Sequence, residues 1–72
     1  MKPGYTENVG KFIRSCHPHA FRSGIWAEVV AVYILNNRPC YAVIWPEDGA
    51  LDLWVCEDSA AEYEFKDTLD GV

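Results

Sequence analysis

The residues best suited to chemistry are one cysteine and two histidines, Cys16, His17 and His19, which fall within four consecutive positions. Thiolate and imidazole groups bind zinc well, and Cys40 or Cys56 could complete a tetrahedral ligand set. There is no Cys-x-x-Cys pair and no second cluster at zinc-site spacing. Adjacent side chains on a strand point to opposite sides, which argues against a Cys16–His17 nucleophile and base. These three residues are therefore only weak metal candidates, and no cofactor is expected.

Carboxylates gather in the second half of the chain. Their order lacks the Asp-x-Asp-x-Asp-Gly core of a calcium loop, and no partner group for proton transfer can be named. They suit a hydrated rim that keeps apolar strands soluble. Tryptophans stand among them, and an aromatic surface rimmed by acids is a good protein-binding patch. The predicted partner-binding surface consists of Trp45, Glu47, Asp48, Asp52, Trp54, Glu57 and Asp58.

The formal net charge of −5 conceals a division between the two halves of the chain. Residues 1–38 carry five basic and two acidic side chains, whereas residues 39–72 carry one basic and nine acidic side chains. An acidic chain is a poor general binder of nucleic acid, because phosphates are neutralised by clustered lysine and arginine. We therefore expect a basic or nucleic-acid-binding protein as partner. The alternative, a nucleic-acid surface in the basic half, would use Lys11, Arg14, His17, His19 and Arg22.

The centre of the chain predicts a mainly β fold. Residues 25–35, IWAEVVAVYIL, are rich in β-branched and aromatic types and predict a long strand. Both alternating faces of this run are apolar. We therefore expect the strand to bend and to contribute its two halves to two packed layers, as strands do at the corners of small barrels.

Turn residues divide the following segment into two more strands. Asn36 and Asn37 predict a tight hairpin that leads to a strand over residues 40–45. Residues 47–49, Glu-Asp-Gly, predict a second turn before a strand over residues 51–56. Three strands then form a meander.

Shorter segments complete the order of elements. Residues 11–15 and 63–65 predict two short strands, and Asp58 or Ser59 can cap one helical or 3₁₀ turn over residues 60–62. About five strands with such a turn before the last one resemble an SH3-like or tudor-like barrel. Tudor-like barrels bind methylated lysine or arginine in aromatic cages rimmed by acids. The alternative is that Tyr41, Val43 and Trp45 fill the core of a small domain.

Spaced residues over about residues 14–65 resemble a pattern of small uncharacterised proteins from actinobacterial phages and prophages. That pattern runs R-S-G-x-W-A, C-Y-x-V-x-W/F-P-D-G, D-x-W and D-x-x-A-x-Y-E-F. The matching residues are Arg22-Ser23-Gly24, Trp26-Ala27, Cys40-Tyr41, Val43, Trp45-Pro46, Asp48-Gly49, Asp52, Trp54, Asp58, Ala61 and Tyr63-Glu64-Phe65. The turn at residues 46–49 is one residue longer than in the pattern. The resemblance implies a phage source and carries no biochemical activity with it.

We expect one domain over residues 11–66, a flexible arm over residues 1–10 and a polar tail over residues 67–72. An odd number of cysteines and the lack of a signal pattern predict free thiols and a location in the cytoplasm, that of a bacterial host if the chain is phage-encoded. No apolar run approaches the roughly 20 residues that span a bilayer. The expected function is a non-enzymatic protein-interaction module, a phage accessory protein that binds or inhibits a host or phage protein. A nucleic-acid-binding barrel, a zinc-stabilised domain and a homo-oligomer are the alternatives.

Overall fold

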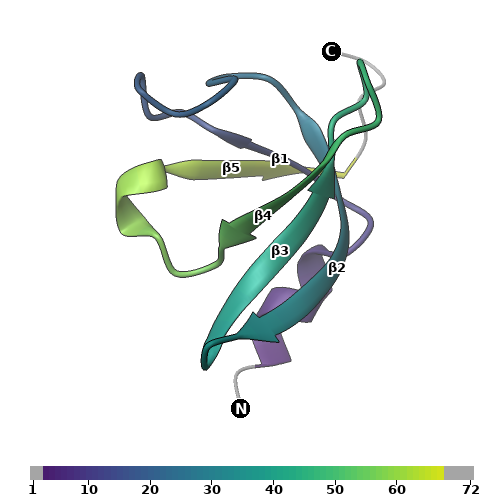
Figure 1. Ribbon diagram of the computed structural model, residues 1–72, viewed down its shortest axis with the longest axis vertical. Coiled ribbons are helices and arrows are strands. Elements are labelled where there is room, and N and C mark those ends of the chain that lie inside the picture. The colour runs from purple at the N-terminus through teal and green to yellow at the C-terminus, as the bar shows by residue number, and fades with distance from the viewer. Residues whose placement is uncertain (1–2, 68–72) are drawn as a thin grey trace.

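The computed structural model describes residues 3–67. Five antiparallel strands form one sheet in the order β4-β3-β2-β1-β5 (Figure 1). The strands are β1 (Phe12–Ser15), β2 (Ala27–Leu35), β3 (Arg38–Ile44), β4 (Leu51–Val55) and β5 (Tyr63–Lys66). Two short 3₁₀ helices, η1 (Pro3–Asn8) and η2 (Ser59–Ala61), complete the fold. Within this part of the chain, no helix has the length and apolar character needed to cross a membrane.

The meander of β2, β3 and β4 follows the predicted turns. Asn36 and Asn37 adopt left-handed φ angles of 50° and 64°, which asparagine tolerates better than most residues. They set Leu35 opposite Arg38 at the start of the β2–β3 ladder. At the second turn Gly49 has a φ of 71°, and its amide donates to the carbonyl of Trp45 at 2.7 Å. Both hairpins predicted from the sequence are confirmed.

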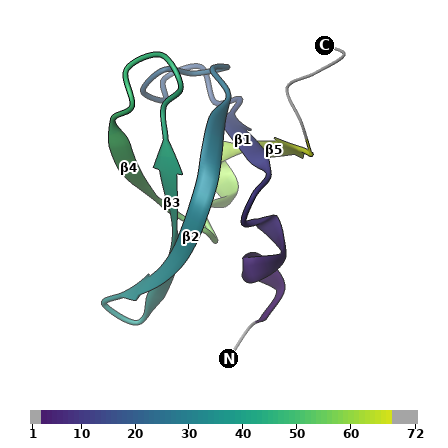
Figure 2. The same cartoon turned by 90° about the vertical axis from the view of Figure 1, so that its right-hand side faces the viewer.

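The predicted bend of β2 is a β-bulge. The register of the β2–β3 ladder shifts between Val29 and Ala31. Before the shift Ala27 and Val29 are buried in the core, and after it Val32 is the residue that packs against the core. A bulge increases local twist, and here it lets the sheet fold over on itself. In Figure 2, β2, β3 and β4 stand side by side while β1 and β5 run across them.

The core lies between these two parts of the sheet. Its buried members are Ile13, Ala27, Val29, Tyr41, Val43, Trp45 and Cys56. The core position predicted for Tyr41, Val43 and Trp45 is thus confirmed. A hydrogen bond from the hydroxyl of Tyr63 to the carbonyl of Val55, at 2.9 Å, links the two outermost strands at one end. The five strands and the 3₁₀ turn before β5 confirm the predicted mainly β fold of a small SH3-like barrel, and the strand order in the sheet is consistent with it.

The main departure lies at the N-terminus. The sequence predicted a loose arm, but Pro3–Asn8 form η1. The ring of Tyr5 meets that of Tyr41 edge-on at 6.2 Å, and the side-chain amide of Asn8 donates to the hydroxyl of Tyr41 at 2.8 Å. These contacts hold the segment against the barrel. Apart from Asp67, the predicted polar tail lies outside the described residues.

The core position of Ile13 generates a stability prediction. Ile13 is fully buried, so Ile13→Val should lower the free energy of unfolding by about 0.5–1.5 kcal/mol, because it leaves a methyl-sized void. The matched control is Ile34→Val, because Ile34 lies on the exposed surface of β2. This substitution should change the free energy of unfolding by less than about 0.5 kcal/mol. Urea denaturation of both variants measures the difference, and equal losses would contradict the placement of β1 in the core.

Candidate functional site

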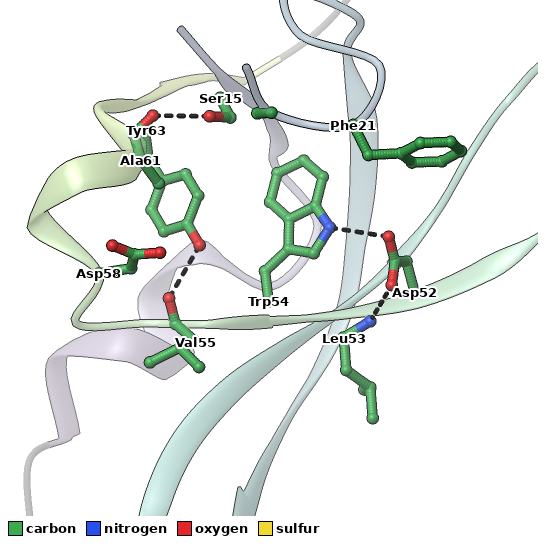
Figure 3. Close-up of a pocket in the computed structure, with 10 residues that line it drawn as sticks. Ser15, Phe21, Asp52, Leu53, Trp54, Val55, Asp58, Ala61 and Tyr63 are labelled. Atoms are coloured by element: carbon green, nitrogen blue, oxygen red, sulfur yellow. Dashed lines mark hydrogen bonds between the residues drawn. The ribbon is translucent and has the colours of Figure 1, made fainter. Parts of the chain in front are cut away.

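A groove of about 350 Å³ is the main hollow described on the molecule. It opens between β4, η2 and the loop that joins β1 to β2 (Figure 3). Aromatic side chains and two carboxylates line it. A second, smaller hollow continues it past Asp58 and Ala61 to His17 and His19.

The aromatic wall is built on β4. Trp54 projects from β4 toward the core side and stacks on Tyr63 of β5, with ring centroids 5.6 Å apart and an angle of 11°. Trp45 supports Trp54 from behind at 5.5 Å and is only 1% exposed. Phe21, from the β1–β2 loop, meets Trp45 edge-on at 6.1 Å yet remains 69% exposed. In Figure 3, Trp54 lies between Tyr63 and Phe21.

The two carboxylates are held by local hydrogen bonds. Asp52 accepts from the indole Nε1 of Trp54 at 3.2 Å and from the amide of Leu53 at 2.9 Å. Asp58 caps η2 by accepting from the amide of Ala60 at 3.1 Å. Neither carboxylate forms an ion pair with any residue in the range 3–67. The groove therefore has two carboxylates with fixed orientation at its edge, and the charge of Asp52 acts on the nearby guanidinium of Arg22.

Tyr63 is fixed at the base of the groove. Burial is the main cause that raises the pKa of Tyr63, and the charge of Asp58 raises it further. Its hydroxyl therefore stays protonated and donates to Val55. Ser15 is also buried and donates its hydroxyl to the carbonyl of Ala61 at 2.7 Å, which anchors η2 to β1.

Arg22 follows the groove residue Phe21 in the β1–β2 loop. Its guanidinium makes two hydrogen bonds to Asp48, at 2.7 and 3.3 Å, and lies 3.4 Å from Glu47. It also lies over the rings of Phe21 and Trp45, 5.0 Å from each centroid. The hydrogen bond from Arg22, with a second from the amide of Ala50, lowers the pKa of Asp48 to about 2. Arg22 thus joins the β1–β2 loop to the β3–β4 turn.

The predicted partner-binding residues do not form one surface. Trp45 is buried, and Glu47 and Asp48 are occupied by Arg22. Glu57 accepts from the hydroxyl of Tyr5 at 2.6 Å, and this hydrogen bond is the main cause that raises the pKa of Tyr5 to about 12. The members of the predicted set that meet in the groove are Asp52, Trp54 and Asp58.

The predicted nucleic-acid residues are dispersed and mostly paired. Lys11 lies 4.0 Å from Asp67, Arg14 lies 2.7 Å from Glu64, and Arg22 is held by Asp48. The amide of His19 donates to Nδ1 of His17 at 3.1 Å, so this pair shapes its own loop. No cluster of unpaired bases results among these residues.

The cysteines are free, as predicted, with Cys40 and Cys56 buried and Cys16 half-buried. Burial is the main cause that raises the pKa of the Cys56 thiol to about 11, which suits a core residue rather than a nucleophile. Among the described residues, no group of three or more histidine, cysteine, aspartate or glutamate side chains is placed to hold a metal ion.

Two aromatic residues of the groove, Phe21 and Tyr63, were not predicted as site residues. Phe21 was not predicted because it lies in a segment whose sequence predicts no strand. The one feature that could have indicated a site is an isolated aromatic residue in a polar stretch. Tyr63 was predicted as a strand residue, but its stacking on Trp54 joins positions that only the closed sheet brings together.

No protein-family model, no curated protein and no solved structure matches this chain. Function is therefore inferred from the groove and from the surfaces around it.

The Arg22–Asp48 pair generates a pH prediction. Because the pKa of Asp48 falls from 3.8 to about 2 on folding, the pair stabilises the fold fully above about pH 4. This stabilisation is lost as the pH falls toward 2. The Asp48→Asn variant should melt at a lower temperature than the wild type at neutral pH, and the two melting temperatures should converge in acid.

The control for this measurement is Asp67→Asn, because the Asp67 side chain is 86% exposed and lies 4.0 Å from Lys11. Its melting curve should follow the wild type at every pH. Glu64 also has a pKa lowered by its arginine partner, so both variants keep some acid sensitivity. A constant difference between Asp48→Asn and wild type from neutral pH to acid would contradict the assigned pair.

Proposed function

We propose that this domain is a non-enzymatic protein-interaction module that receives a lysine or arginine side chain of a basic partner in its groove. One observation carries the proposal: the groove combines exposed aromatic surface with two carboxylates that form no ion pair within residues 3–67. The charge of Asp52 does act on the guanidinium of Arg22, but that guanidinium is paired with Asp48 and Glu47. Aromatic faces attract cations through the ring quadrupole, and nearby carboxylates strengthen the attraction. The arrangement suits a cation better than an anion or a neutral ligand.

The chain already uses the same chemistry within itself. Arg22 lies over two aromatic rings while it pairs with acids of the adjacent turn. The groove offers a comparable set, with Trp54 and Phe21 as rings and Asp52 and Asp58 as acids. Local hydrogen bonds already orient the acids, so a cation does not have to order them on binding.

The charge of the chain supports a basic partner. Nine of the eleven acidic residues fall in residues 39–72, the half that supplies β4, η2 and β5. Such a field attracts basic proteins over distances of a Debye length and repels nucleic acid. A nucleic-acid-binding protein of the host or of a phage is the partner class that fits this charge and the phage-like sequence pattern. The domain would then compete with nucleic acid for the basic surface of that protein.

The nucleic-acid alternative has less support, because Lys11, Arg14 and Arg22 each pair with a carboxylate. The zinc alternative has no supporting cluster among the described residues. Absence of retention in a gel-shift assay at low salt is the result expected here.

Titration with a short lysine- and arginine-rich peptide tests the proposal. We expect chemical-shift changes at the Trp54 indole and the Phe21 amide, and an affinity that falls with added salt. Phe21→Ala should weaken binding roughly 2- to 30-fold, because it removes one exposed ring while leaving the buried core intact. Asp52→Asn should weaken it as well.

The matched control is Glu7→Gln, which removes one exposed negative charge on η1 away from the groove. It should bind the peptide nearly as well as the wild type. If Glu7→Gln and Asp52→Asn weaken binding equally, the attraction comes from net charge and the groove has no special role. A peptide that shifts no groove resonance would overturn the proposal.

A further inference from the structure

The outer face of the β2–β3–β4 meander, the face turned away from the core, is apolar. Tyr41, Val43 and Trp45 point into the core, so Cys40 and Ala42, which alternate with them, point outward. The ladders place Ala42 beside Leu53 and Cys40 beside Tyr33. Cys40 and Ala42 are themselves only 6% and 1% exposed, so the exposed surface of this face is formed by the larger side chains around them: Tyr33, Leu35, Leu51 and Leu53. A contiguous apolar surface of this kind on a small soluble domain marks an interaction site.

Two opposite charges stand at the two ends of this face. Arg38 pairs with Leu35 at one end of the β2–β3 ladder, and Glu28 pairs with Ile44 at the other. The two ends lie roughly 20 Å apart along β3. Neither Arg38 nor Glu28 forms an ion pair with a residue in the described range. Both charges are therefore available to a partner.

We propose that a second copy of this chain packs on the outer face, so that the domain forms a two-fold symmetric homodimer. A two-fold interface uses the same patch on both copies and must be self-complementary. An apolar centre satisfies this condition. With the two-fold axis running across the strands, the sheets stack with opposite strand directions, and Arg38 of each copy comes beside Glu28 of the other. With the axis along the strands, like charges would meet, so the charges select the first arrangement.

The structure favours the face over the edge of the sheet as the contact. The open edge of β4 could accept another strand, but the side chain of Asp52 already accepts from the amide of Leu53. An amide that already donates to a side chain is not free to pair with an added strand, and the charged side chain of Asp52 on this edge also disfavours edge pairing. Face-to-face stacking of two meanders leaves that hydrogen bond intact.

The size of the face sets the expected strength. Three strands give a face roughly 14 Å wide and 20 Å long, or about 280 Å² in each copy, which is smaller than the roughly 800 Å² that each partner buries in a standard interface. We therefore expect a weak dimer, with a dissociation constant on the order of hundreds of micromolar. The groove lies on the core side of β4 and stays open in this dimer, so the dimer and the groove are independent proposals.

Sedimentation equilibrium of the 72-residue chain tests the dimer. From about 10 µM to about 1 mM protein, the weight-average mass should rise toward twice the monomer mass. Leu51→Lys places a charge on the face and should raise the dissociation constant at least about tenfold. The matched control is Ile34→Lys, because Ile34 and Leu51 are 58% and 63% exposed and lie on opposite faces of the sheet. The Ile34→Lys variant should dimerise like the wild type.

A charge exchange identifies the second copy and its orientation. Arg38→Glu alone and Glu28→Lys alone each bring like charges together twice in the symmetric dimer and should weaken it. The double variant restores both contacts and should recover most of the wild-type affinity. Such recovery requires that the partner be another copy of the same chain.

Three results would overturn the inference: a monomer at every concentration, equal weakening by Leu51→Lys and Ile34→Lys, or no recovery in the double variant. Peptide binding by Leu51→Lys separates the two proposals. If the monomeric Leu51→Lys variant binds the basic peptide as the wild type does, the proposed function of the groove is supported independently of the dimer. If the wild type dimerises but binds no peptide, the dimer stands alone.

Discussion

The structure depends on the double pairing of β1, a strand of only four residues. β1 pairs with β2 through Phe12 and Ile13, and all four of its residues pair with β5. It is the element that joins the meander to the C-terminal segment. At its end the carbonyl of Ser15 accepts from the amide of Gly24, and its hydroxyl donates to the carbonyl of Ala61. The loop that carries Phe21 and the segment that carries Tyr63 are thus held by one buried residue.

Much of the fold could be predicted because its signals are local. β-branched and aromatic runs fixed the strands to within two residues at each end, and asparagine and glycine marked both hairpins where φ is positive. The 3₁₀ helix η1 could not be predicted in this way. Proline and glycine in that segment favour a loose chain, and contacts with residues far along the chain give it a fixed place: Tyr5 and Asn8 contact Tyr41, and Tyr5 donates to Glu57.

The site was predictable only in part. Asp52, Trp54 and Asp58 were found because acids and tryptophans alternate along one short segment. Glu47 and Asp48 are separated from them because they bind Arg22, which lies more than twenty positions away in the sequence. Glu57 is separated because it accepts a hydrogen bond from the distant hydroxyl of Tyr5. Pairing between distant charges requires the closed sheet. Because Arg22 pairs with Glu47 and Asp48, it is not free to bind a phosphate, and it instead joins the β1–β2 loop to the β3–β4 turn.

The bulge at Val29–Ala31 decides which side chains in the second half of β2 face the core. Both alternating sets of β2 are apolar, so hydrophobicity alone does not decide which set faces the core. The extra residue decides it, by changing the phase of the strand halfway along. If β2 kept all its residues but alternated strictly after Val29, Val32 would turn outward and Tyr33 and Leu35 would turn inward. Deletion of the unpaired Val30 would leave Ala31 opposite Ala42 and Val32 opposite Tyr41, so it would remove the bulge and its extra twist without changing which side chains face the core.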